Sequence, residues 1–441
     1  MTAARRTVAA AALFVLTGVP AMAAEPCPDC LQAGAATVNL PVPAGTPLAG
    51  YGGWARRLIA PDVFGRFPHA FWFRPHEGVL DPVVARALVL ESPAARVVWI
   101  TADLVAVDQG FTTRIKRGLA KAGGRPSTLV VAASHTHSGP GAFFDSRLLA
   151  MLTVDREDGE VRDALVGAIM EAVQRAEAAK SPAHVGVLAA AGPALTTGRL
   201  DAPVDQTLAI LKVVTPAGAP IAVLWNYAIH GTMLGPVNLK LSGDVMGVAS
   251  RGIERELHAP ALFVNGAVGD VSPARHGVAE MTPASRELAS AVMAAWAKTP
   301  TSPQTPLRAR TSTLTMPTPR LSLRNCVARW LPAGLTVPLG SAFPDRTELV
   351  AVGIGRTAWV AIPGELQSEV GESVKRSGAS AWERVFIAGL ANDYLGYFLT
   401  PRDAVKPSYV ACASVYGPGA GERVARAAVA LLKRLADGAD R

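Results

Sequence analysis

The distribution of hydrophobic residues along the chain predicts strands that alternate with helices. Short runs rich in Val, Ile and Leu are typical of largely buried strands; they occupy residues 97–105, 129–133, 185–189, 208–214, 221–229, 261–264, 348–354, 357–362 and 385–390. Other stretches have apolar residues at helical spacing, at residues 113–122, 161–179, 245–257, 284–297, 366–376 and 422–435. This alternation predicts an α/β fold with a mixed β-sheet core and flanking helices.

Two proline-containing connections refine this prediction. The turn at residues 215–220 separates two strands by a few residues, which predicts a hairpin and therefore some antiparallel pairing. The Pro- and Thr-rich stretch 299–319 is the best candidate for a subdomain connection or a long surface loop. Apart from that stretch, residues 25–441 are expected to form a single catalytic domain.

The N-terminus has the three regions of a secretory signal peptide. Two arginines precede a short apolar run, and small residues follow it up to an expected cleavage near Ala23 or Ala24. The run is too short to span a bilayer comfortably. We therefore expect residues 1–24 to be removed and the protein to be exported, to a periplasm or to the outside of the cell.

Composition narrows the classes of partner. Hydrophobic residues make up 50% of the 441 positions, enough for a substantial core. The net charge of +8 suits an anionic lipid surface as well as an ordinary basic exported protein, and no basic tract interleaved with aromatics predicts nucleic-acid binding. The sequence leaves open whether Cys27 pairs with Cys30, whether Cys326 pairs with Cys412, or whether the thiols stay free.

The candidate chemistry begins where the predicted strand 129–133 runs into a turn that carries His135 and His137. Neutral imidazole is among the commonest zinc ligands, and a strand end holds such a ligand rigidly. Alternate residues of a strand point to opposite faces, however, so the pair can equally be one buried and one solvated histidine. The pair indicates a metal site only if further ligands lie elsewhere in the chain.

Four other predicted strands also run into polar, chemically active residues. Strand 221–229 precedes His230, strand 261–264 precedes Ser272, strand 357–362 precedes Glu365, and strand 385–390 precedes Tyr397. In open α/β sheets, ligands bind at the carboxyl ends of the strands. We therefore expect the five strand ends to share one cleft.

Together these motifs resemble those of the neutral/alkaline non-lysosomal ceramidases. The matching pieces occur in the family's order: His135-Thr136-His137-Ser138-Gly139-Pro140, Asn226 with His230-Gly231-Thr232, Ser242-Gly243-Asp244, Gly269-Asp270-Val271-Ser272-Pro273, Pro363-Gly364-Glu365, and Asn392-x-Tyr394-x-x-Tyr397 with Tyr409 and Tyr416-Gly417-Pro418. Several separated motifs in order are more specific than any one of them.

The resemblance implies a single zinc ion held by His135, His230, Glu365 and Tyr397. Two neutral imidazoles and one carboxylate are suitable ligands, and a catalytic zinc keeps one position open. Each residue also has an ordinary structural interpretation. The histidine at position 230 can be a satisfied core residue, the glutamate can complement a helix N-terminus, and the tyrosine can be core packing.

The resemblance also implies roles in catalysis for four residues. His137 would carry a proton from water to the leaving amine, or it would only orient its loop. Ser272 would be either a nucleophile or a hydrogen-bond donor, and the sequence shows no base for it. Arg199 and Tyr409 would stabilise the oxyanion, although an arginine at position 199 can equally be a solvated surface residue.

These roles predict an exported zinc-dependent amidohydrolase that cleaves ceramide, or a related N-acyl lipid, to a fatty acid and a sphingoid base. The alternatives are a zinc hydrolase of a smaller N-acyl amide or ester, and a noncatalytic lipid-binding relative. The family usually has asparagine at the position of Ala274, glutamate at that of Val410, and a further C-terminal β-sandwich domain that we do not expect here. These departures put long-chain selectivity and lipid-interface binding in question.

An aromatic-rich segment at residues 64–73 has three interpretations. It lines an entrance for an acyl chain, it contacts a membrane surface, or it is a loop folded over the core. The third arrangement is the most frequent for such clusters.

Overall fold

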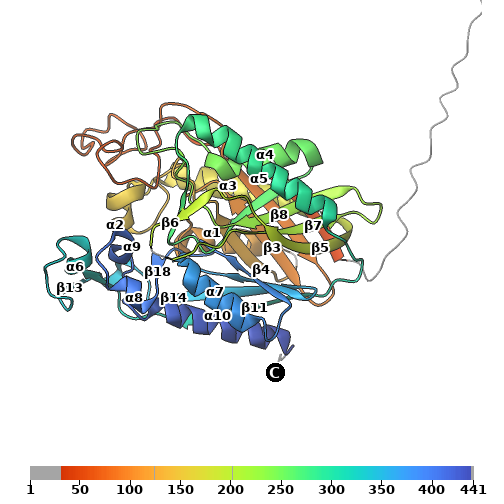
Figure 1. Cartoon of the computed structure of the whole chain (residues 1–441). Helices are drawn as coiled ribbons and strands as arrows, with labels where there is room; N and C mark the ends of the chain where they lie inside the picture. The colour runs from red at the N-terminus through yellow and green to blue at the C-terminus, as the bar shows by residue number, and fades with distance from the viewer. Residues whose placement is uncertain (1–30, 124, 201, 439–441) are drawn as a thin grey trace, which may run out of the picture.

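The computed structural model describes residues 31–123, 125–200 and 202–438. The expected signal peptide at residues 1–24, and with it Cys27 and Cys30, lies outside these residues. The described chain forms two packed β-sheets with helices on their outer faces, as Figure 1 shows. The predicted mixed sheet core with flanking helices is confirmed.

The larger sheet has eight strands in the order β4-β3-β2-β1-β5-β7-β8-β9. Their bounds are β1 Leu31–Asn39, β2 Val84–Glu91, β3 Arg96–Ala102, β4 Thr128–Ala133, β5 Ser181–Ala191, β7 Thr207–Val214, β8 Pro220–Tyr227 and β9 Ala261–Asn265. β3 pairs with β4 in parallel, as does β8 with β9, whereas the other neighbours are antiparallel. The predicted hairpin at residues 215–220 is the β7–β8 connection.

The smaller sheet has the order β11-β14-β15-β17, with β15 and β17 parallel. Its strands are β11 Leu307–Thr315, β14 Arg346–Ile354, β15 Thr357–Ala361 and β17 Arg384–Ala388. Its inner face packs on the larger sheet through a shared apolar core, in which the rings of Trp99 and Trp359 lie 5.7 Å apart, edge to face. Each sheet therefore covers one face of the other.

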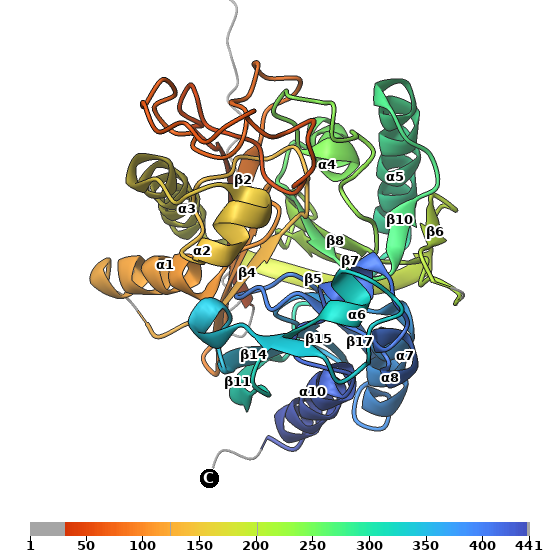
Figure 2. The same cartoon turned by 90° about the vertical axis from the view of Figure 1, so that its left-hand side faces the viewer.

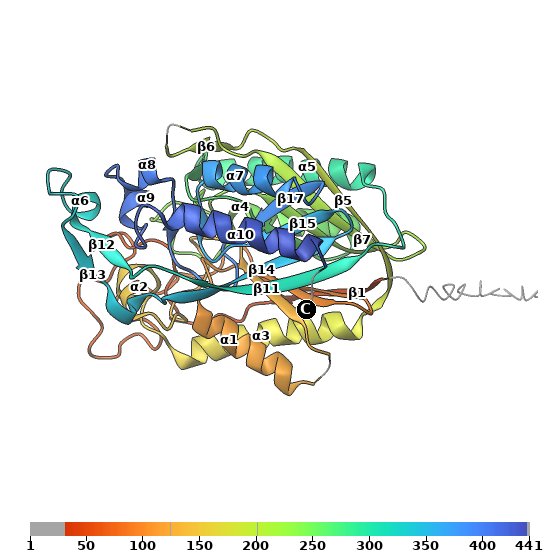
Figure 3. The ribbon, with the colours of Figure 1, turned by 90° about the horizontal axis from the view of Figure 1, so that it is seen from below.

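Helices cover the two outer faces. Helices α1 (Gln109–Lys121), α3 (Gly159–Ala178), α4 (Asp244–Leu257) and α5 (Val278–Lys298) pack on the larger sheet, while α7 (Ser368–Gly378) and α10 (Ala420–Ala436) pack on the smaller one. Figure 3 shows α10 lying across β11 and β14. Caps fix the helix starts; the Asp108 carboxylate, for example, accepts a hydrogen bond from Phe111 N. Within the described residues, no helix has the length and apolarity needed to cross a bilayer.

All the predicted strands and helices are present, with ends displaced by a few residues. In the two large sheets β1, β2 and β11 were not predicted, and neither were the two- and three-residue strands outside those sheets. β11 lies within residues 299–319, so that stretch is not simply a loop. Its Thr-, Ser- and Arg-rich sequence suits an edge strand that is half exposed to water. β1 is rich in alanine and glycine because α3 crosses it closely: a Cβ on Gly34 would lie 2.1 Å from the Ala176 carbonyl oxygen.

Candidate metal centre

His135 enters the interior because the chain turns sharply after β4. The residue has a φ of 71°, in the left-handed region that costs energy for a residue with a Cβ and is often found at functional sites. Its Nδ1 lies 2.6 Å from the carbonyl oxygen of Val105, to which it donates as the Nδ1–H tautomer. This hydrogen bond leaves Nε2 with a free lone pair, as a metal-binding histidine requires.

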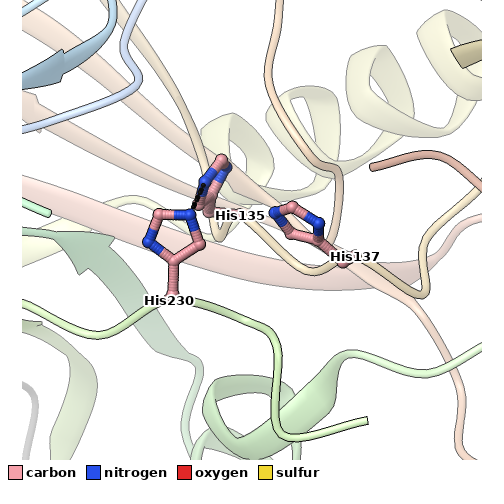
Figure 4. A group of neighbouring side chains, drawn as sticks. All are labelled: His135, His137 and His230. Carbon is pink, nitrogen blue, oxygen red and sulfur yellow. Dashed lines mark hydrogen bonds between the residues drawn. The ribbon is translucent and has the colours of Figure 1, made fainter. Parts of the chain in front are cut away.

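His230 follows β8, and its turn is held against the turn of His135 by one side chain. The Asn265 amide, at the end of β9, donates to the carbonyl oxygens of Ser134 (3.2 Å) and Ile229 (2.8 Å). As a result the Nε2 atoms of the two histidines lie 2.9 Å apart. The dashed line in Figure 4 marks this contact. Both side chains are buried.

Glu365 reaches the same point from the other half of the chain. It lies on β16 (Glu365–Leu366), which pairs in parallel with β18 (Tyr397–Phe398). Its Oε1 accepts a hydrogen bond of 2.8 Å from the hydroxyl of Tyr394. Its Oε2 is 3.4 Å from the Nε2 of His135 and 3.4 Å from that of His230. The carboxylate is thus anchored through one oxygen and faces the two imidazoles with the other.

These three atoms fit a small divalent cation. Tetrahedral zinc with bonds of about 2.0–2.1 Å places neighbouring ligand atoms about 3.3 Å apart, close to the spacing found here. Glu365 Oε2 is buried without a hydrogen-bond partner, as is Nδ1 of His230. Buried polar atoms without partners are rare in folded proteins. The donor set is therefore compatible with a metal ion between the imidazoles and the carboxylate.

His137 lies beside this pair but points differently. The three imidazoles each offer a nitrogen within 4.8 Å of the others, and Figure 4 shows the ring of His137 set apart from the other two. Its ring lies 4.8 Å from that of Tyr51, and neither of its nitrogens has a hydrogen-bond partner. Burial, followed by the charges of His135 and Arg199, lowers the pKa of His137 well below its usual value. A neutral imidazole of this kind can accept a proton, and the role of His137 as proton carrier stays a prediction.

Arg199 and Ser272 are neighbours on a small two-stranded sheet. β6 (Thr196–Gly198) pairs with β10 (Val271–Pro273), and the Nε of Arg199 donates to the Oγ of Ser272 over 2.7 Å. The charge of Arg199 also contributes to lowering the pKa of His137 and of His230. The guanidinium therefore acts on the centre and is not simply a solvated surface group.

Two tyrosines complete the region. Tyr397 is buried, and burial followed by the negative charge of Glu365 raises its pKa well above the usual value. Tyr409 begins α9 (Tyr409–Cys412); its ring lies 6.1 Å from that of Tyr397, and it is 71% exposed. Tyr397 is thus buried inside the centre, and Tyr409 lies on its solvent-exposed side. We call this exposed side, at Tyr409, the mouth of the centre. The predicted roles of ligand and oxyanion donor stay predictions.

A disulfide between Cys326 and Cys412 lies next to Tyr409. It joins α6 (Leu323–Cys326) to α9. The side chain of Asn325 donates to Ala411 O of α9 over 3.4 Å and to Ala404 O, at the end of α8 (Pro401–Ala404), over 2.9 Å. Of the pairings that the sequence left open, this one is present.

The structure brings the eight predicted site residues into one region, and it adds three that sequence reasoning did not assign. Tyr394 stands within a motif already noted, and Asn265 directly follows the predicted strand 261–264, so their positions after strand ends were the available signal. Tyr51 lies in a loop without periodicity, and no pattern in the sequence marks it.

Comparisons with known proteins point to one family. The family model for the N-terminal part of neutral/alkaline non-lysosomal ceramidases matches residues 73–315. Neutral ceramidase B of Dictyostelium discoideum is 24% identical over 222 residues, 44% of this chain and 31% of that protein. A neutral ceramidase of Mycobacterium tuberculosis is 27% identical over 227 residues, 44% of this chain and 36% of that protein. The match thus spans about a third of the length of these relatives.

Solved structures show the same fold. Neutral ceramidase from Pseudomonas aeruginosa superposes with a TM-score of 0.79 at 18% identity, over 93% of this chain and 75% of that one. A ceramidase complexed with C2 superposes with a TM-score of 0.77 at 16% identity, over 93% and 76%. The family match covers more than half of the chain and includes both histidines at the centre. The chain belongs to the neutral/alkaline non-lysosomal ceramidase family.

Proposed function

We propose that this protein is a zinc-dependent amidohydrolase that cleaves the N-acyl amide bond of ceramide or a related N-acyl lipid. The products are a fatty acid and a sphingoid base or similar amine. Family membership supports the reaction class. The observation that carries the metal is the unpartnered, buried Oε2 of Glu365, which faces the Nε2 atoms of His135 and His230.

The proposed chemistry divides the work among the residues of the centre. His135, His230 and Glu365 would hold the ion, with Tyr397 as a fourth, displaceable ligand. A bound zinc ion would polarise the amide carbonyl and bring the pKa of a water molecule to about 7. His137 would take the proton from the attacking water and return it to the amide nitrogen as the C–N bond breaks.

The oxyanion would be stabilised by donors at the mouth. The guanidinium of Arg199 retains donors beyond the Nε that contacts Ser272, and the Tyr409 hydroxyl lies on the exposed side. Ser272 has this guanidinium beside it, a group that stays protonated and cannot accept its proton. This neighbour supports a hydrogen-bonding role for Ser272 and direct attack by water.

We also propose that the protein is exported. The disulfide between Cys326 and Cys412 supports an oxidising compartment, since such bonds are rare in the cytosol. Selective alkylation of free thiols, in protein taken directly from cell fractions, tests this: the bonded pair should be protected and found in the exported fraction.

One experiment tests the enzyme proposal. Zinc content is measured in purified protein, together with fatty-acid release from ceramide, for wild type, His135→Ala and the exposed control His258→Asn. We expect one zinc per chain in wild type and control, and loss of zinc with at least a thousandfold loss of activity in His135→Ala. Full activity without metal would overturn the mechanism.

The same experiment separates the alternatives. If the protein binds zinc but hydrolyses only a short N-acyl amide or ester, its substrate is that smaller compound and not ceramide. Ceramide binding without turnover of any amide or ester would identify a noncatalytic relative.

A further inference from the structure

Large apolar side chains are exposed in two segments of this protein. In residues 51–74, Trp54 is 85% exposed and Phe64 is 86% exposed, with Ile59 exposed between them. In residues 323–337, Trp330 is 81% exposed and Val327 is exposed close by. Single exposed apolar residues are common, but clusters of them mark surfaces that bind a partner or a membrane.

The first segment is attached directly to the metal centre. The ring of Tyr51 packs on His137, and Arg56 donates through Nη2 to the His137 carbonyl oxygen over 3.1 Å. The Nε of Arg56 also donates to Pro236 O, which places exposed Val237 beside this segment. The exposed residues therefore follow closely on residues that line the centre.

The base of this segment packs on a neighbouring turn, η1 (Ala150–Val154). Arg57 donates to the carbonyl oxygen of Met151 over 2.7 Å, and a Cβ on Gly52 would lie 2.1 Å from the Leu152 oxygen. Met151 and Leu152 are themselves partly exposed and extend the apolar surface.

The aromatic stretch 64–73 divides at this point. The backbone N–H groups of Phe71, Trp72 and Phe73 donate to the buried carboxylate of Asp155, so the end of the stretch is a loop folded onto the core. The beginning of the stretch is not folded onto the core, because Phe64 projects into solvent.

The second segment reaches the centre from the other side. α6 leads into β13 (Thr336–Pro338), and the disulfide from Cys326 ties α6 to the helix that begins with Tyr409. Figures 1 and 3 place α6 and β13 at the same end of the molecule as the 51–74 loops. Figure 2 looks onto this end, with the orange-red loops above and α6 below them. The two apolar segments thus lie at one end of the molecule, the first attached to His137 and the second to the helix that begins with Tyr409.

Charge favours one kind of partner. Besides the buried Arg56, residues 54–74 contain three arginines and one aspartate, and residues 320–337 contain three arginines and no acidic residue. Tryptophan prefers the interface of a bilayer, and each basic residue near an anionic leaflet contributes about 1 kcal/mol to binding. A protein partner of the same shape would need acidic groups matched to these arginines, whereas an anionic membrane supplies them everywhere.

We propose that this surface docks on an anionic phospholipid membrane and turns the mouth of the metal centre toward it. The apolar rim consists of Trp54, Ile59, Phe64, Met151, Leu152, Val237, Val327 and Trp330. A lipid leaving the bilayer between the two segments would meet Tyr409 on one side and Tyr51 with His137 on the other. The proposal goes beyond the proposed function, because it concerns where the protein binds and not which bond it cleaves.

Sedimentation with vesicles tests the rim without any substrate. Three proteins are compared: wild type, Trp54→Ala/Trp330→Ala, and the control Val278→Ala, whose side chain is exposed at the start of α5. Each is mixed with phosphatidylcholine vesicles, either pure or with roughly 30% phosphatidylglycerol as the anionic lipid. We expect wild type and control to partition onto the anionic vesicles. Each tryptophan removed should weaken partitioning by about tenfold, from the apolar area lost. Arg329→Gln should weaken it by about fivefold, on anionic vesicles only.

The outcomes decide the proposal independently of catalysis. Hydrolysis of a soluble short-chain amide without vesicles should be the same for wild type and Trp54→Ala/Trp330→Ala, which excludes misfolding. No binding of wild type to either vesicle, or equal binding of the double variant, would overturn the proposal. If wild type forms dimers in solution but does not bind vesicles, and if the double variant is monomeric, then the rim joins two copies of the chain and not the protein to a membrane.

Discussion

Tyr394→Phe is the sharpest test of how the carboxylate is held. The Tyr394 hydroxyl donates to Oε1 of Glu365 over 2.8 Å, and this bond leaves Oε2 facing the two imidazoles. Burial, followed by the charge of Glu365, raises the pKa of Tyr394 well above its usual value, so the phenol remains a donor at any working pH. Phenylalanine keeps the ring and removes only the hydroxyl.

The magnitude follows from the charge on the acceptor. A hydrogen bond to a charged group is worth about 1.5–3 kcal/mol, and groups that orient a metal ligand typically change affinity by about 10–100-fold. We therefore expect the zinc Kd of Tyr394→Phe to rise by about 10–100-fold. The assay is a competition titration of metal-free protein against a chromophoric chelator, which reads affinity without activity.

The control is Tyr416→Phe, which removes a hydroxyl that donates to Pro344 O over 2.6 Å. It should leave zinc affinity unchanged. An unchanged Kd in Tyr394→Phe, or the same weakening in both variants, would refute the view that this hydroxyl orients Glu365.

Three further predictions follow from other contacts. Ser272→Ala should lower kcat by about tenfold if the hydroxyl only donates a hydrogen bond; a loss of about a millionfold would instead identify a nucleophile. Gly50→Ala, at a φ of 100°, would bring a Cβ within 2.6 Å of the His137 ring; activity should fall while the zinc Kd stays constant, and weaker zinc binding would make His137 a ligand. Burial raises the pKa of Asp393 to about 6 in the folded protein. The unfolded chain therefore loses this proton at a lower pH than the folded protein does. As pH rises from about 4 to 6, the unfolding free energy should fall by up to about 3 kcal/mol. Denaturant titrations should show no such contribution in Asp393→Asn, and parallel pH profiles for the two proteins would contradict the shift.

Most of the strands that the sequence predicts are those where burial is nearly complete. Strand β2 is an exception: its first seven residues are buried, but Arg86 interrupts the apolar run and the strand was not predicted. Strand β4 is an unbroken apolar run because both of its faces are covered, and such runs stand out. β11 lies at a sheet edge, where alternate residues face water, and its polar sequence looks like a loop. β1 has small residues imposed by the crossing of α3, which only the tertiary structure reveals.

The site divides in the same way. His135 and His230 follow strong strands, so their places at strand ends could be predicted. Their proximity could not, because β4 and β8 lie near opposite edges of the larger sheet, and those edges approach each other only in the tertiary structure, through the contact of β4 with β9. The contact of Tyr394 with Glu365 depends on the pairing of two short strands, and two-residue strands leave no periodic signal. The position of Tyr51 depends on a loop that returns to the centre from far away in sequence, so composition and spacing contain no information on it.

The two imidazoles of the candidate metal centre lie on turns that follow strands of the larger sheet. The carboxylate of Glu365 comes from the half of the protein that contains the smaller sheet. An ion bound there would act as a clamp between the halves, stabilising their docking by a free energy that grows with the free metal concentration. Withdrawal of the ion should therefore increase hydrogen exchange first around β16 and β18, where the carboxylate side of the clamp has the shortest strands. The order of synthesis adds a second consequence. The histidines leave the ribosome well before Glu365, so a nascent chain has an incomplete clamp until the smaller half has folded against the larger one.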